Sequence, residues 1–215
     1  MKITWYGHAA FLVETMGLRI ILDPYRSPDC GGYEPIADRA DIVAVSHEND
    51  RYHSHLGQIA GPFDVVRGLE LPEGGTIVHG IRFEAIHVFE TPEKVPEDEV
   101  TILHFRAEGL HVVHLGDLGH PLTDEELAPI RGADILLASA GGPPTIDYPD
   151  VPALIASIAP RWIVPNHYLT PKINLKIQPV ERFLEALPGW EVDRPGATSF
   201  EPGGPPRIVV LDHAR

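Results

Sequence analysis

The chain has 215 residues, of which 43% are hydrophobic and 22% are charged, a composition typical of a globular protein large enough to bury a core. Its 17 basic and 31 acidic residues give a formal net charge of −14 at pH 7, so most of its surface repels nucleic-acid phosphates and anionic lipid. The single cysteine excludes an intrachain disulfide, and no apolar run is long enough to span a bilayer. We therefore expect a cytoplasmic protein without a nucleic-acid or membrane partner, folded as one domain over residues 1–215.

Short apolar runs separated by turns predict strands through the first half of the chain. These strands are expected over 3–6, 11–14, 18–22, 42–45, 64–67, 76–79, 81–88, 101–107 and 111–115. In the second half, strands are expected over 133–138, 162–164 and 207–211, and helices over 123–127, 151–158 and 179–187. Thr123 and Glu126 form a capping box that begins the first helix. This order predicts an α/β fold in which helices flank two packed sheets, a four-layer αββα sandwich.

Twelve histidines in a chain rich in carboxylates indicate a metal site. Four candidate ligands lie at the end of a predicted strand or within three residues after it: His47, His87, Asp117 and His167. A hydrolytic metal site needs imidazoles and carboxylates that converge from different loops, with one position left open for a water. The shared strand-end position of these four residues predicts such a site.

Seven segments of the chain carry a more specific pattern. They are ITWYGHAAFLVET at the start, then ILDPY, VSH, VVRG, HLGDLGHPLT, GGPPTID and PNHYLTPKI. Together they resemble the metallo-β-lactamase-fold hydrolases, and among these the small prokaryotic group similar to ascorbate-6-phosphate lactonase. The resemblance implies a single αββα domain with one or two metal ions between the sheets, usually zinc and in some members manganese or iron.

The loop after the fourth predicted strand departs from the HxHxDH pattern of that family. His47 matches the first ligand, but Asn49 stands where the pattern has a second histidine. Arg51 and Tyr52 stand in the places of its aspartate and last histidine. Asn49 would therefore contribute at most a weak oxygen ligand.

Outside this loop, the resemblance places the remaining ligands at His87, Asp117 and His167. His47, His87 and Asp117 are enough donors for one catalytic metal ion. We expect one divalent ion, with zinc as the first expectation and manganese or iron as alternatives. A second ion beside Asp117 and His167 is doubtful, because that site has lost its own carboxylate and histidine.

The altered loop leaves two alternatives open. A shifted register would turn His53 or Asp50 inwards as a ligand, whereas His53 and His55 would otherwise be exposed residues near Leu56. Arg51 either binds a substrate carboxylate or phosphate bidentately in the place of the second metal, or pairs with an aspartate in a metal-free site.

Several other residues are secondary candidates. His8 and His120 either line the site or form structural hydrogen bonds with the backbone. Asp23 is expected to fix a turn near the site. Tyr168 and Tyr52 are candidates to donate a hydrogen bond to a developing oxyanion.

Two functions follow from these residues. The first is a metal-dependent hydrolase that acts on a small anionic ester, lactone or phosphoester. In this mechanism the metal activates a water, Asp117 takes its proton and Arg51 holds the charge of the substrate. The alternative is a non-catalytic or metal-free binding protein on the same fold, because the metal loop is altered. The expected partner is a small molecule, and association into a homo-oligomer is left open.

Overall fold

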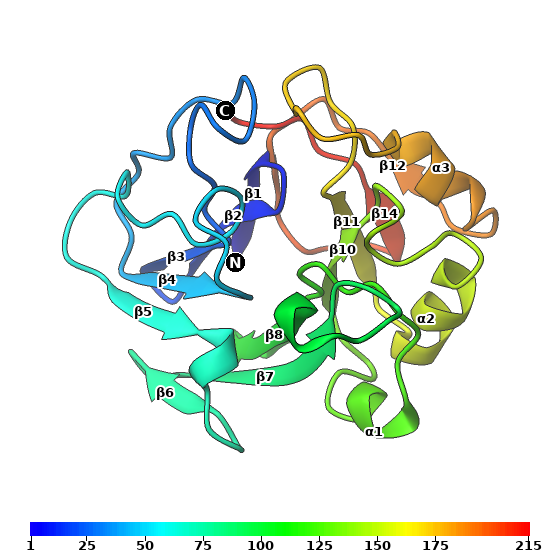
Figure 1. The fold of residues 1–215 in the computed structure, drawn as a ribbon, viewed down its shortest axis with the longest axis horizontal. Helices are drawn as coiled ribbons and strands as arrows, with labels where there is room; N and C mark the ends of the chain where they lie inside the picture. The colour runs from blue at the N-terminus through cyan, green and yellow to red at the C-terminus, as the bar shows by residue number, and fades with distance from the viewer.

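The computed structural model describes all 215 residues and contains two β-sheets (Figure 1). The six-stranded sheet contains, in spatial order, β13 (Ser199–Phe200), β1 (Lys2–Gly7), β2 (Ala10–Thr15), β3 (Leu18–Leu22), β4 (Ile42–Val45) and β5 (Asp64–Arg67). The eight-stranded sheet contains β12 (Val192–Asp193), β14 (Arg207–Val209), β11 (Trp162–Asn166), β10 (Ile135–Ser139), β9 (Leu110–His114), β8 (Glu99–Ala107), β7 (Ile81–Phe89) and β6 (Thr76–Val78).

Alternating side chains divide the core between the two faces of the six-stranded sheet. On β3 and β4, Ile20 and Ile42 join a cluster of 46 buried residues that also takes in the eight-stranded sheet. The intervening residues Ile21 and Val43 belong to a separate cluster of 14 buried residues. Because successive side chains of a strand point to opposite faces, the large cluster lies between the sheets and the small one lies outside the six-stranded sheet.

All three α-helices follow β9 in the chain: α1 (Asp124–Leu127), α2 (Val151–Ile158) and α3 (Val180–Glu185). They lie on the side of the eight-stranded sheet (Figure 1). The outside of the six-stranded sheet is covered by loop residues such as Tyr25 and Ile36. Prolines at positions 24, 28 and 35 disfavour a helix in this segment. No helix is long and apolar enough to cross a membrane.

The predicted fold class is confirmed, with loops in place of helices as the layer outside the six-stranded sheet. Every predicted strand and helix is present, with its ends within two residues of the expected ones. The capping box is also present, since the Thr123 hydroxyl accepts from the Glu126 N–H and the Glu126 carboxylate accepts from the Thr123 N–H. The two-residue strands β12 and β13 were too short for periodicity to reveal.

Candidate metal centre

Both sheets deliver polar side chains to one rim of the molecule. His8 and Asp23 directly follow β1 and β3 of one sheet, and His167 directly follows β11 of the other. These three residues have positive φ angles of 50°, 42° and 49°, a strained conformation that is uncommon outside glycine and clusters at functional sites. His47 and Asp117 follow β4 and β9 at slightly greater distance. The strand ends thus collect histidines and carboxylates from chain segments far apart in sequence.

His53 lies at the centre of this group, with only 1% of the residue exposed. Its Nδ1 is 3.0 Å from Asp23 Oδ2, and its Nε2 is 3.0 Å from Asp117 Oδ2. The preceding turn is closed by the Asn49 carbonyl, which accepts hydrogen bonds from the backbone N–H groups of residues 52, 53 and 54. The loop therefore adopts the alternative in which His53 turns inwards. Burial lowers the pKa of this ring, but the two carboxylates outweigh burial and raise it to about 10.

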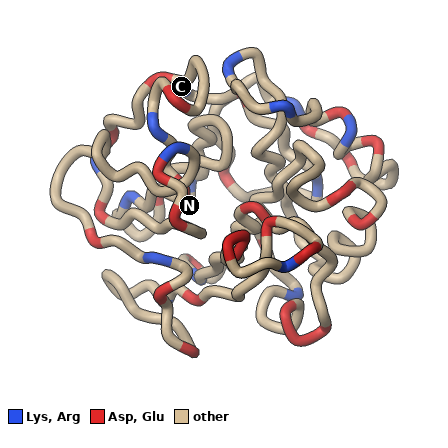
Figure 2. Tube along the Cα trace, viewed as in Figure 1, with Lys and Arg blue, Asp and Glu red and all other residues tan.

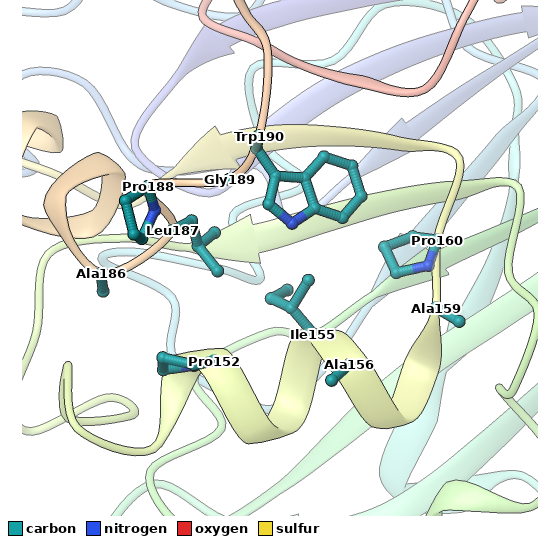
Figure 3. Close-up of a pocket in the computed structure, with 10 residues that line it drawn as sticks. All are labelled: Pro152, Ile155, Ala156, Ala159, Pro160, Ala186, Leu187, Pro188, Gly189 and Trp190. Carbon is teal, nitrogen blue, oxygen red and sulfur yellow. The ribbon is translucent and has the colours of Figure 1, made fainter.

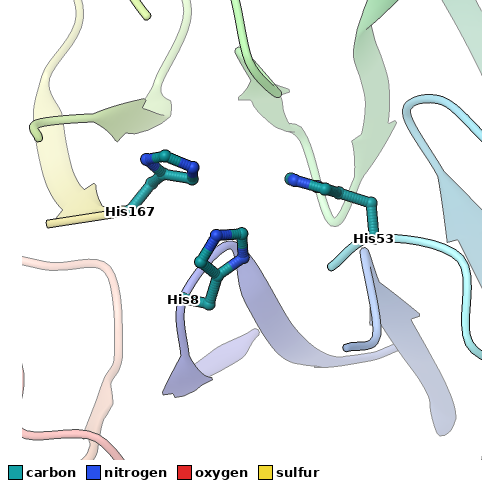
Figure 4. A group of neighbouring side chains, drawn as sticks. All are labelled: His8, His53 and His167. Carbon is teal, nitrogen blue, oxygen red and sulfur yellow. The ribbon is translucent and has the colours of Figure 1, made fainter. Parts of the chain in front are cut away.

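Two triads of possible ligands share His53. In the first, the side chains of His8, His53 and His167 point towards one another (Figure 4). In the second, His53 lies with His47 and Asp117. Within each triad, the candidate ligand atoms all lie within 4.8 Å of one another. Either spacing is compatible with donors around one metal ion.

Unpaired buried atoms show that these donors fit a metal ion. His47 Nε2, Asp117 Oδ1, His167 Nδ1 and both ring nitrogens of His8 are buried without a hydrogen-bond partner. Burial lowers the pKa of His47 to about 4, and it also lowers the pKa of His8 and of His167, so these rings are neutral. Buried polar atoms without partners cost free energy, and neutral imidazoles beside a carboxylate are the donors that a divalent transition metal takes. The residues present therefore fit such an ion.

Asp23 fixes the orientation of the neighbouring side chains. Its carboxylate accepts hydrogen bonds from the Ser46 N–H (2.7 Å), the Ser46 hydroxyl (2.6 Å) and His114 Nε2 (2.8 Å), besides its contact with His53. Burial opposes ionisation, but His114 and His53 hold the pKa of Asp23 well below its usual range. A histidine whose Nδ1 is fixed by a carboxylate presents Nε2 to a metal. Asp23 thus has a larger part than the turn predicted for it.

The prediction that His87 is a ligand is corrected by the structure. Its side chain is 47% exposed and its Nδ1 lies 2.8 Å from Glu99 Oε1. Strand β7 continues to Phe89, so the residue that follows the strand is Glu90, which lines the cavity at the metal centre. Burial, helped by the negative charge of Asp117, raises the pKa of Glu90 to about 7. The apolar periodicity predicted this strand, but it did not show that the first residue after the strand is Glu90.

Arg51 and Tyr168 also lie away from the centre, which corrects their predicted roles. The Arg51 side chain is exposed. Its Nε donates to the Asp29 carbonyl at 2.9 Å, and its guanidinium packs over the Tyr52 ring. The Tyr168 hydroxyl donates to the Leu211 carbonyl, and its ring packs 5.0 Å from Trp5. Neither residue lines the cavity.

Of the two remaining secondary histidines, His8 lines the site and His120 is structural. His120 Nδ1 lies 2.8 Å from the Pro121 carbonyl, and its Nε2 accepts from the Phe89 N–H. Both ring nitrogens are therefore occupied within the protein. His8 has no such partners.

A cavity of about 200 Å³ opens onto the centre. It is lined by His8, Asn49, Tyr52, His53, Glu90, Asp117, Pro144, His167, Leu175, Lys176 and Ile177. Asn49 therefore lies at the site, as the sequence predicted. The sequence analysis missed Glu90 and Lys176, because neither belongs to a recognisable motif. The size of the cavity suits a small molecule.

A larger hollow of about 500 Å³ lies between α2 and the segment that follows α3 (Figure 3). It is lined by Pro152, Ile155, Ala156, Ala159, Pro160, Ala186, Leu187, Pro188, Gly189 and Trp190. None of these side chains is ionisable, so this hollow offers no group for acid–base or metal chemistry.

Residues 2–167 match the family described as a beta-lactamase superfamily domain. The chain belongs to the beta-lactamase superfamily. It is 30% identical over 193 residues to a UPF0173 protein of Pyrococcus abyssi, covering 79% of this chain and 84% of that protein. It is also 30% identical over 196 residues to a UPF0173 metal-dependent hydrolase of Carboxydothermus hydrogenoformans, covering 79% and 85% of the two chains.

Two solved structures agree with the fold. A metallo-beta-lactamase superfamily protein of Thermotoga maritima superimposes with a TM-score of 0.78 and 29% identity, covering 98% of this chain and 97% of that one. A metallo hydrolase of Ignicoccus hospitalis gives a TM-score of 0.64 at 20% identity, covering 94% and 99%, and it shows the fold alone. The predicted superfamily is confirmed, whereas the narrower likeness to ascorbate-6-phosphate lactonase stays a prediction.

Proposed function

We propose that this protein is a metal-dependent hydrolase that cleaves an ester, lactone or phosphoester bond in a small anionic substrate. The observation that carries the proposal is the set of buried, unpaired histidine and aspartate atoms at the cavity. Relatives with the name metal-dependent hydrolase support it, as does the Thermotoga maritima structure, a proposed Zn-dependent hydrolase.

One metal ion is the proposed stoichiometry, with zinc as the first expectation and manganese or iron as alternatives. Both ligand triads require His53, and its Nδ1 is already bonded to Asp23. Only Nε2 of this ring is left for a metal, and an ion there would displace the proton that the ring otherwise shares with Asp117 Oδ2, 3.0 Å away. His47, His53 and Asp117 are the proposed ligands, with His167 Nε2 3.6 Å from Asp117 Oδ1 at their side.

The chemistry is divided between the ion and the cavity wall. When bound, a divalent ion lowers the pKa of a water towards about 7 and polarises the substrate bond. Asp117 orients the attacking water through its second oxygen. Glu90, whose pKa is about 7, is suited to exchange a proton with the leaving group near neutral pH. Leu175, Ile177 and Pro144 limit access of bulk water.

Metal content of the purified protein tests this proposal, because the structure places His47 at the centre and His87 on the exposed side of β7. We expect about one equivalent of zinc or another divalent metal by inductively coupled plasma mass spectrometry. His47→Ala should lose that metal. His87→Ala is the matched control and should keep it, because His87 is paired with Glu99 at the surface.

The corresponding activity measurement uses 4-nitrophenyl esters and bis(4-nitrophenyl) phosphate with the metal-loaded protein. We expect hydrolysis that falls at least about 100-fold in His47→Ala and persists in His87→Ala. Loss of metal in both variants would contradict the ligand assignment. A wild-type protein that takes up none of zinc, manganese and iron would contradict the hydrolase itself.

A further inference from the structure

The cavity is lined by two carboxylates and a single basic side chain other than histidine. Glu90 and Asp117 are its carboxylates, and both are at least partly buried, whereas Lys176 is its only lysine or arginine. Lys176 is exposed at the cavity and forms no ion pair or side-chain hydrogen bond within the protein. A lysine ammonium that is free of internal partners is available to a ligand.

The backbone around Lys176 is fixed, so its position at the cavity is defined. The neighbouring residue Ile177 is buried, and the Gln178 N–H donates to the Gly141 carbonyl at 2.8 Å. The Gln178 carbonyl accepts from the Leu169 N–H at 2.9 Å. Nearer the start of the same loop, the Lys172 carbonyl accepts a hydrogen bond from the Gly32 N–H at 2.7 Å.

The location of this segment is visible in the charge distribution. Lysine positions occur in the loop between β11 and α3 (Figure 2), in a chain whose formal net charge is −14. Such a net charge disfavours the approach of an anion. A local cation at the mouth of the cavity counters that effect where a substrate enters.

We propose that Lys176 binds the anionic group of the substrate, a carboxylate or a phosphate, and so selects anionic over neutral substrates. The inference rests on the proposed function, which places the scissile bond of the substrate at His47 and Asp117. Because the cavity measures about 200 Å³, a substrate held at its floor reaches the mouth with few intervening atoms. Lys176 thus takes the role that the sequence suggested for Arg51.

The test compares two esters that differ by one terminal carboxylate: 4-nitrophenyl butyrate and the mono-4-nitrophenyl ester of glutaric acid. We expect Lys176→Met to lower kcat/KM for the anionic ester at least about tenfold, mainly through KM, since one charge-assisted contact is lost. The neutral ester should change less than about twofold. Lys176→Arg should restore most of the preference, and Lys172→Met, in the same loop but outside the cavity lining, should retain it.

Binding of glutarate and of inorganic phosphate to the zinc-loaded protein, measured by calorimetry, separates this inference from the proposed function. Anion binding that weakens about tenfold in Lys176→Met supports the inference even if wild-type protein hydrolyses neither ester, a result that would overturn only the hydrolase. The stronger of the two anions identifies carboxylate or phosphate as the preferred group. Equal affinity in wild-type and Lys176→Met, equal losses for both esters, or absence of anion binding to wild-type protein would overturn the inference.

Discussion

At the scale of single residues, Asp23 decides how His53 meets a metal. It is fully buried and accepts from Ser46, His53 and His114. We expect Asp23→Asn to weaken zinc binding about 10- to 100-fold, because an amide cannot accept all of these hydrogen bonds and His53 loses its fixed orientation. Competition with a chromogenic chelator measures the affinity.

Asp41→Asn is the matched control for this substitution. Asp41 also accepts a hydrogen bond from the backbone N–H of a strand residue, Arg19, at 2.9 Å, but it precedes β4 and lies outside the cavity lining. Its zinc affinity should equal that of the wild-type protein. An Asp23→Asn protein that is folded and binds zinc normally would show that His53 needs no carboxylate to orient it.

The sequence could locate part of this centre because some of its residues follow predictable strands. His47, Asp117 and His167 lie at such strand ends and reach the site. His53 depends instead on the conformation of a loop that is closed by the Asn49 carbonyl, and no periodic pattern encodes that turn. Glu90 was missed because β7 extends to Phe89, one residue beyond the predicted end of that strand. A local turn without a period decides the first case, and the pairing of β7 with β8 as far as Phe89 and Glu99 decides the second.

At the scale of elements, Gly119 joins the end of β7 to the loop that carries Asp117. Its N–H donates to the Phe89 carbonyl at 2.9 Å, and a methyl group at its Cα would lie 1.6 Å from the Glu90 carbonyl oxygen. We expect Gly119→Ala to lower the free energy of unfolding by at least about 2 kcal/mol, because backbone atoms must move apart, and to weaken zinc binding. Urea denaturation and the chelator assay measure these two effects.

Gly189→Ala is the control, because a methyl group there meets no atom within 4 Å. Its unfolding free energy should stay within about 0.5 kcal/mol of the wild-type value. If Gly119→Ala were equally harmless, the close approach of these two segments would have no part in shaping the site.

The elements themselves were predictable because strand and helix periodicities are local. Strands β3 and β4 follow directly from short apolar runs, which are typical of strands buried on both faces. The layer outside the six-stranded sheet was less predictable. It consists of loops whose conformation depends on packing of residues such as Tyr25 and Tyr33 against the sheet, and loop packing of this kind has no sequence period.

At the scale of the whole molecule, stability depends on pH through buried histidines remote from the metal centre. His111 on β9 accepts a hydrogen bond from Arg106 at Nδ1, and its Nε2 lies 3.4 Å from His104 Nδ1. Burial, with the positive charge of Arg106 and the nearness of His104, lowers the pKa of His111 to about 4, although Asp134 acts in the opposite direction. Burial also lowers the pKa of His104, against the effect of Glu84.

The sign of the effect follows from which state binds the proton. In an unfolded chain a histidine titrates near about 6.5, so between pH 6.5 and 4 the unfolded state takes up a proton that folded His111 refuses. The stabilisation is therefore complete above about pH 6.5 and is lost as pH falls towards 4. We expect His111→Gln to remove about 1–3 kcal/mol of the pH dependence, measured by urea unfolding of metal-free protein from pH 8 to 4.5. The difference in stability between wild type and variant should be constant above pH 7 and should shift in favour of the variant as pH falls. A difference that stays the same across this range would show that His111 does not remain neutral in the folded protein.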